Sequence, residues 1–235
     1  MGLKDQVTNY VRETFGSDWE IKVEDEVPTE DDALPLTNGG VQIEAAVLYA
    51  DLRDSTGLVA RQTREFAAEV YKTYVRAAVR SVGHYSGTVT AYDGDRVMGV
   101  FMGGQARNHA VGASTLISAI VEDIIQPELN AQYGAGKYKV EQKVGIDWST
   151  LTVANTGIRG NNDYVWVGTA ANNAAKLATL RRGYTTYATS AVYDVLNEAN
   201  RTLVSGAPMW TDLGTSDLGF RVYGANARKV HIPNY

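Results

Sequence analysis

The sequence contains no cysteine among its 235 residues. Disulfide bonds, zinc sites built on thiolates and thiol catalysis are therefore excluded. Long apolar runs are also absent: none approaches the roughly 18 residues that span a bilayer, and the first sixteen residues lack the apolar core of a signal peptide. These absences predict a cytoplasmic protein with no membrane partner.

Positive charge is also scarce. The chain has 22 Lys and Arg residues against 27 Asp and Glu residues, for a net charge of −5. Proteins that bind nucleic acids or anionic membranes usually present a basic surface, so neither partner is expected. Phosphate groups, if bound, need a local site or bound cations. The three histidines, at positions 84, 109 and 231, have no metal-ligand spacing.

The chain divides into an N-terminal segment, residues 1–40, and a main domain, residues 41–235. The N-terminal segment opens with apolar residues at helical spacing, which predict a short amphipathic helix ending near Gly16. These residues are Leu3, Val7, Val11 and Phe15. Acidic residues dominate between positions 20 and 32 and are interpreted as a linker into the main domain.

In the main domain, apolar periodicity and turn signals predict alternating strands and helices. The expected elements are a strand over 41–50, a helix over 62–82, a hairpin over 88–101, a helix over 108–129, a strand pair over 138–148 and 151–155, a strand over 164–167 and a helix over 172–180. A smaller tail adds a strand over 185–188, a helix capped by Ser190, and strands over 220–223 and 229–232. This order is typical of an α+β fold, a split βαβ arrangement with helices on one face of the sheet.

Two aspartates lie at the ends of predicted strands. Asp51 follows the apolar run VLYA, and a buried carboxylate costs several kcal/mol unless a salt bridge, a hydrogen-bonded turn or a metal compensates it. Asp95 follows the Asp93-Gly94 turn of the hairpin, which would bring it close to Asp51. Two adjacent carboxylates repel unless a cation lies between them, and Mg²⁺ suits such a site. Alternatively, these aspartates only form the turn and cap the next segment.

A third candidate site lies in the stretch DYVWVGTAANNAAKL. Asn172 and Lys176 are four residues apart in its predicted helix and so share one helical face. An amide and a cation on one face can hold a sugar ring and neutralise a phosphate. The simpler interpretation is that both are ordinary solvated surface residues.

Four segments, taken together and in order, resemble the catalytic domain of class III nucleotidyl cyclases. They are YADLRDST, SGTVTAYDGDRVMGVF, KVGIDWSTLTVANTG and VGTAANNAAKL. The resemblance extends from about residue 41 to about residue 230. It implies a class III cyclase-like fold: a ferredoxin-like βαββαβ core with helices packed on an antiparallel sheet, plus a small C-terminal α/β extension.

The resemblance also implies a homodimer whose active sites are shared between the two protomers. One protomer would bind two Mg²⁺ or Mn²⁺ ions through Asp51, Asp95 and the carbonyl of Leu52, and the other would contribute Asn172 and Lys176. Lys176 stands where the family usually has arginine, so it offers the point charge of an ammonium group in place of a planar guanidinium group. The triphosphate would contact Arg53, Ser55, Thr56 and, near the C-terminus, Arg221, although alignment places Tyr223 at the family's lysine position.

The base pocket departs from the purine cyclases of the family. Their base-reading positions correspond to Ala91 and Val165, neither of which can exchange a directed hydrogen bond with a purine. Tyr49 lies two residues before Asp51, on the same face of its strand, and either narrows the pocket towards a pyrimidine or is a core aromatic.

This pattern resembles the stand-alone pyrimidine cyclases of bacterial Pycsar anti-phage defence, whose cyclic UMP or cyclic CMP activates a separate effector. Overall resemblance favours UTP as the substrate, although no residue separates uracil from cytosine. The alternatives are a cytidylate cyclase, an adenylate or guanylate cyclase with an atypical pocket, and a catalytically silent nucleotide-binding domain.

Overall fold

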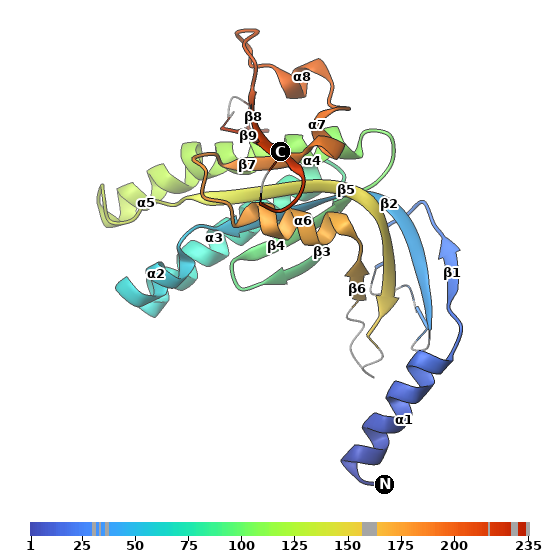
Figure 1. Cartoon of the computed structure of the whole chain (residues 1–235). Coiled ribbons are helices and arrows are strands. Elements are labelled where there is room, and N and C mark those ends of the chain that lie inside the picture. Colours follow the sequence, from blue (N-terminus) through green and yellow to red (C-terminus); the bar gives the residue numbers. More distant parts are fainter. Residues whose placement is uncertain are drawn as a thin grey trace.

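The computed structural model describes residues 1–29, 32, 34–35, 38–156, 164–215, 217–226 and 230–233. Its strands are β1 (Glu20–Val23), β2 (Gly39–Leu52), β3 (Thr88–Asp93), β4 (Arg96–Phe101), β5 (Gln142–Asn155), β6 (Tyr164–Val167), β7 (Thr186–Thr189), β8 (Trp210–Thr215) and β9 (Arg221–Ala225). They form one sheet in the order β3-β4-β2-β5-β7-β9-β8, in which β1 also pairs with β2 and β6 with β5. The two long strands β2 and β5 run through the centre of the molecule (Figure 1).

The helices are α1 (Leu3–Gly16), α2 (Ser55–Arg61), α3 (Arg64–His84), α4 (Ala106–Ile120), α5 (Gln126–Tyr133), α6 (Thr169–Ala178), α7 (Ser190–Tyr193) and α8 (Glu198–Arg201). A π-helical turn, η1 (Val121–Ile125), joins α4 to α5. No helix in the described part of the chain is long and apolar enough to cross a membrane. The architecture is the predicted α+β class, with a sheet that is antiparallel except where β1 pairs with β2 and β5 with β7.

Helices cover both faces of the sheet, whereas the sequence predicted helices on one face only. Alternate residues of β2 point to opposite faces. Leu48 and Ala50 join the core under α3 and α4, while Ala45 and Val47 join the core under α6. The apolar run of β2, which hardly alternates with polar residues, already indicated a strand buried on both faces.

Two predicted elements of the main domain differ in the structure. The expected strand pair over 138–148 and 151–155 is one continuous strand, β5, because Ser149 and Thr150 interrupt the apolar pattern without interrupting the ladder with β2. The expected helix over 108–129 is divided into α4, η1 and α5. The hairpin of β3 and β4 forms as predicted.

In the tail, the helix expected to be capped by Ser190 is α7, but Ser190 is its first residue and Thr189 occupies the cap position. Strands β1 and β8 and helices α2 and α8 were not predicted. The last expected strand falls partly on residues 227–229, outside the described residues, and residues 230–233 adopt neither helix nor strand.

Helix α1 forms as predicted and projects from the end of the sheet (Figure 1). No residue of α1 is buried, and Leu3 and Phe15 are 77% and 87% exposed. The base of this arm is fixed by the Asn38 amide, which donates to the carbonyls of Thr14 and Ser17 at 2.6 and 2.7 Å. Strand β1, within the predicted acidic linker, then joins the sheet beside the start of β2.

Candidate active site

The carboxylate of Asp51 lies where β2 ends, between a cation on each neighbouring strand. In the sheet, Asp51 is opposite Arg96 of β4 and opposite Lys143 of β5. Its Oδ2 lies 3.3 Å from the Arg96 guanidinium, and the side chain is only 19% exposed. Burial raises the pKa of Asp51, Arg96 opposes that shift, and the charge of Asp95 adds to it. The buried charge of Asp51 is therefore compensated by a salt bridge, which is one of the three alternatives that the sequence left open.

Asp95 lies in the tight turn between β3 and β4, next to the arginine that pairs with Asp51. Gly94 makes this turn with a φ of 59°, a conformation that glycine adopts without steric cost. The Oδ2 atom of Asp95 is buried and has no hydrogen-bond partner among the described residues. The hairpin thus brings the two carboxylates together and leaves one buried carboxylate oxygen without a hydrogen bond. Oxygen atoms of this kind are suitable ligands for a hard cation.

A cavity of about 230 Å³ opens beside Asp51. The turn after β2 forms one wall, with Arg53, Ser55 and Thr56, and Lys143 and Arg181 face it from β5 and from the segment after α6. Asp54, in the same turn, has a φ of 58°, an uncommon conformation for a residue other than glycine. Three cations and a polar turn next to a carboxylate pair make this cavity suitable for a polyphosphate.

Lys143 is a site residue that the sequence analysis missed. It is 9% exposed, and its ammonium donates a hydrogen bond to the carbonyl of Tyr184. Burial, and then the nearby charge of Arg53, lower the pKa of Lys143. A lysine directly before the apolar run VGI of the predicted strand was the available signal, because buried lysines are rare unless they are paired.

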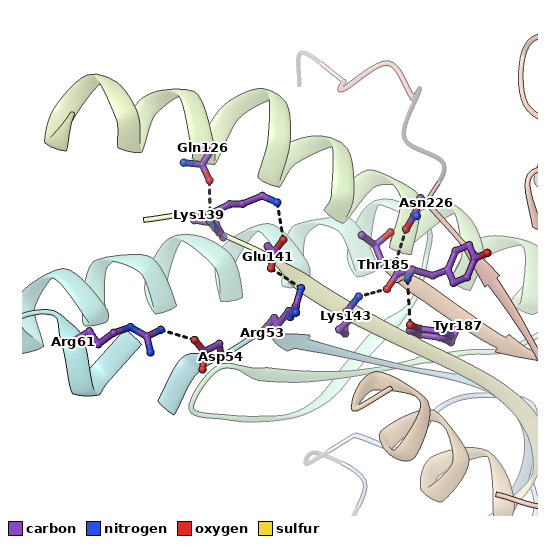
Figure 2. Close-up of polar contacts among 12 residues, drawn as sticks. Arg53, Asp54, Arg61, Gln126, Lys139, Glu141, Lys143, Thr185, Tyr187 and Asn226 are labelled. Carbon is purple, nitrogen blue, oxygen red and sulfur yellow. Dashed lines mark hydrogen bonds and ion pairs between the residues drawn. The ribbon is translucent and has the colours of Figure 1, made fainter. Parts of the chain in front are cut away.

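Glu141 holds two of the cations near this cavity (Figure 2). Its carboxylate lies 2.7 Å from the Arg53 guanidinium and 2.7 Å from the Lys139 ammonium. The hydrogen bond from Lys139 is the main cause of its lowered pKa. Arg53, predicted to bind a triphosphate, is therefore engaged with an internal carboxylate in this structure. A second cavity, of about 600 Å³, extends along this side and is lined by Arg53, Lys143 and Arg181 as well.

Tyr49 and Ala91 lie in one row across three strands. Tyr49 is opposite Met98 on β4, and Met98 is opposite Ala91 on β3, so the three side chains share one face of the sheet. Tyr49 is half-buried, and its burial raises the pKa of its hydroxyl. Ala91 is exposed. Tyr49, at the centre of this row, lies two residues before Asp51 on β2. The row lies on the same face of the sheet as helix α6.

Asn172 and Lys176 are both exposed and lie on one face of α6, as their spacing predicted. The opposite face of the helix packs on the sheet through Ala170, Ala171 and Ala174. The two side chains therefore point away from the core of their own chain.

Helix α6 is fixed to β5 by polar contacts at its first turns. The amide of Asn173 donates to the buried Asp147 at 2.9 Å, and the N–H of Ala170 donates to the Ser149 hydroxyl at 3.0 Å. Gly145 allows the closest approach, because a Cβ at this position would lie 2.1 Å from the carbonyl oxygen of Ala174. The backbone of α6 consequently rests directly on the backbone of β5.

Two predicted site residues lie away from the Asp51 cavity within one chain. Val165 pairs with Ala154 on β5, which in turn pairs with Gly40 at the other end of β2. At about 3.3 Å per residue, roughly 35 Å of strand separates Gly40 from Asp51. Arg221, on β9, is paired with Asp212. Neither residue lines the cavity, and neither do Asn172 and Lys176.

Comparisons with known proteins agree with this architecture. No family model matches the chain. The uridylate cyclase of Xanthomonas perforans is 44% identical over 210 residues, covering 89% of this chain and 90% of the relative. The uridylate cyclase of Burkholderia cepacia is 39% identical over 224 residues, covering 95% and 96%.

Solved structures of nucleotidyl cyclases share the fold. A bacterial light-regulated adenylyl cyclase superposes with a TM-score of 0.68 at 23% identity, covering 84% of this chain and 56% of the other. The adenylyl cyclase CyaB from P. aeruginosa superposes with a TM-score of 0.64 at 22% identity, covering 80% and 96%. The fold expected from the sequence motifs is therefore confirmed.

Proposed function

The chain belongs to the uridylate cyclase family of nucleotidyl cyclases, and from this premise we propose that it converts UTP to 3′,5′-cyclic UMP and pyrophosphate. The observation that carries the proposal is the pairing of Asp51 with Asp95 beside a cavity rich in cations. The resemblance of the sequence to the Pycsar pyrimidine cyclases supports the wider role: the product would be a second messenger for a separate effector in anti-phage defence, and the enzyme would act in the cytoplasm.

Divalent cations, Mg²⁺ or Mn²⁺, would be held by Asp51, Asp95 and the carbonyl of Leu52. The unpartnered Oδ2 of Asp95 supports this assignment. No group of three or more histidines and acids gathers in the described residues, which is consistent with a cation that takes its remaining ligands from water and phosphate. When bound, two such cations make the ribose 3′ hydroxyl more acidic and neutralise the triphosphate.

The residues of the chain itself would bind and orient the triphosphate. Lys143 and Arg181 face the cavity from one side, and Ser55 and Thr56 supply hydroxyl and backbone donors from the other. Arg53 would join them after leaving Glu141. Together these groups would hold the α-phosphorus in line with the 3′ oxygen, so that pyrophosphate is the leaving group.

Each active site would be shared between two protomers of a homodimer. The outward orientation of Asn172 and Lys176 on α6 supports this arrangement, because neither residue lines the cavity beside Asp51 of its own chain. From the partner, Asn172 would orient the ribose and Lys176 would stabilise the charge that develops on the phosphate. Arg221 and Val165 would likewise act only across the interface.

Separate incubation with UTP, CTP, ATP and GTP, with Mg²⁺ or Mn²⁺ and identification of products by mass spectrometry, tests the proposed reaction. Cyclic UMP as the main product supports it. Cyclic CMP would identify a cytidylate cyclase, and a cyclic purine nucleotide would show that the base pocket accepts purines. No cyclic product under any condition would leave the silent nucleotide-binding domain as the answer.

Replacing Tyr49 by alanine is expected to lower the preference for UTP over ATP by about tenfold or more, because a wider pocket no longer rejects a purine by fit. The preference is measured as a ratio of kcat/KM values. Tyr49→Phe is the control, since it keeps the ring and removes only the hydroxyl. An unchanged preference in Tyr49→Ala, together with a lower Tm, would make Tyr49 a core aromatic.

Replacing Glu141 by glutamine is expected to lower the KM for UTP by about two- to fivefold while leaving kcat unchanged, since Arg53 and Lys139 lose a competing carboxylate worth up to about 1 kcal/mol. Steady-state kinetics at low ionic strength measure this effect. Glu44→Gln, at an exposed position of β2, is the charge-matched control. A higher KM in Glu141→Gln would instead mean that Glu141 holds Arg53 in its productive position.

A further inference from the structure

Tyr74 carries a fully buried hydroxyl that has no hydrogen-bond partner among the described residues. The residue lies on α3 and is 0% exposed. Buried tyrosine hydroxyls normally find a partner, because an unpaired one loses its hydration without compensation. A phenylalanine would fill the same space in the core without this penalty. A tyrosine at this position therefore needs an explanation other than packing.

Tyr74 lies in the core beneath the strands that end at the carboxylate pair. Helix α3 packs against β2, β3 and β4, the strands that carry Asp51 and Asp95 at their ends. The Tyr74 side chain belongs to the same core cluster as Leu52 and Val97, which flank the two aspartates along the chain. The charges of both aspartates act on the phenol.

The orphan atoms of Tyr74 and Asp95 are complementary. The phenol is a donor without an acceptor, and the Oδ2 of Asp95 is a buried acceptor without a donor. A tyrosine hydroxyl can donate one hydrogen bond, so the phenol can serve as the donor to this carboxylate.

We propose that Tyr74 is a positioning residue for the metal-binding carboxylates: in the metal-bound enzyme its hydroxyl donates to the carboxylate of Asp95, a contact that this structure does not contain, and so fixes the orientation of that carboxylate. The inference rests on the proposed function, which requires a divalent cation at Asp51 and Asp95. Hydrogen bonds to carboxylate ligands fix their orientation, and their loss typically weakens metal binding or activity by about 10- to 100-fold.

The test is Tyr74→Phe, which keeps the ring and removes one oxygen atom. Thermal unfolding of the metal-free protein, and the Mn²⁺ concentration that gives half of the maximal Tm increase, are measured alongside the Mn²⁺ dependence of cyclisation. We expect the metal-free Tm to stay the same or rise, and both Mn²⁺ midpoints to rise by about tenfold. Tyr85→Phe is the matched control, because this half-buried tyrosine follows α3 and packs against Gly112 of α4.

The outcomes separate this inference from the function on which it rests. A wild-type protein that neither shifts its Tm nor gains activity with Mn²⁺ would overturn both. A wild-type protein that responds to Mn²⁺ while Tyr74→Phe responds at the same concentration would overturn only the role of Tyr74. A lower metal-free Tm with unchanged Mn²⁺ midpoints would also overturn it, since the hydroxyl would then serve only the fold.

Discussion

Replacing Asp51 by asparagine is expected to reduce cyclisation of UTP by about a thousandfold or more without destabilising the protein. A metal ligand that contributes about 4 kcal/mol to transition-state stabilisation accounts for three powers of ten in rate. The stability of the metal-free protein should hold, because the raised pKa of Asp51 means that its charged form is penalised in the folded state. This penalty grows as the pH rises from the unfolded to the folded pKa and is constant at higher pH, and the neutral amide removes it.

The measurements are kcat at saturating UTP and Mn²⁺, and Tm at pH 7 without metal. Asp93→Asn is the matched control, since Asp93 is also opposite Arg96, in the β3–β4 pairing, and its side chain is exposed. It should retain activity within about twofold, as surface substitutions usually do. Full activity in Asp51→Asn would contradict the cation site. A large fall in its Tm would mean that the Arg96 ion pair is chiefly structural.

Mixing two inactive variants is expected to restore activity. Asp51→Asn and Asn172→Ala each damage both sites of their own homodimer. A heterodimer of the two has one site with both defects and one site with none. With random pairing at equal amounts, half of the dimers are heterodimers, so about a quarter of wild-type activity should return. Co-expression with two affinity tags allows the mixed dimers to be isolated, and these should show about half of wild-type activity because one of their two sites is intact.

The control for complementation is a pair of variants whose substitutions lie in the part of the active site that one protomer supplies, called here one half-site. Asp51→Asn mixed with Asp95→Asn should restore nothing, because both residues would come from the same protomer of every site. If the first mixture also failed, although mixed dimers could be isolated, the shared-site arrangement would be wrong. If the second mixture recovered activity, the assignment of Asp51 and Asp95 to one half-site would be wrong.

The parts of the site that depend on local sequence could be predicted. The apolar run before Asp51 is enough to place this residue at the end of a strand. The Asp-Gly turn is enough to place Asp95 at the start of the returning strand of a hairpin. Likewise, the spacing of Asn172 and Lys176 is enough to place both on one face of α6.

The parts that depend on distant partners could not be predicted. The ammonium of Lys143 is held by a carbonyl 41 residues further along the chain, and Arg53 is held by Glu141, 88 residues away. The sequence predicts a break between strands at residues 149–150, but the Ser149 hydroxyl lies within β5 and accepts a hydrogen bond from the N–H of Ala170 in α6. No periodicity within a strand reports such a contact.

The close contact of α6 with β5 has a consequence for how substrate preference can evolve in this fold. At Gly145 the two backbones meet with no side chain between them. Exchanging side chains there cannot adjust the distance between helix and sheet, because any substitution collides with the carbonyl of Ala174. If Tyr49 and Ala91 line the base pocket as proposed, substitutions at these strand positions can change the pocket without moving α6.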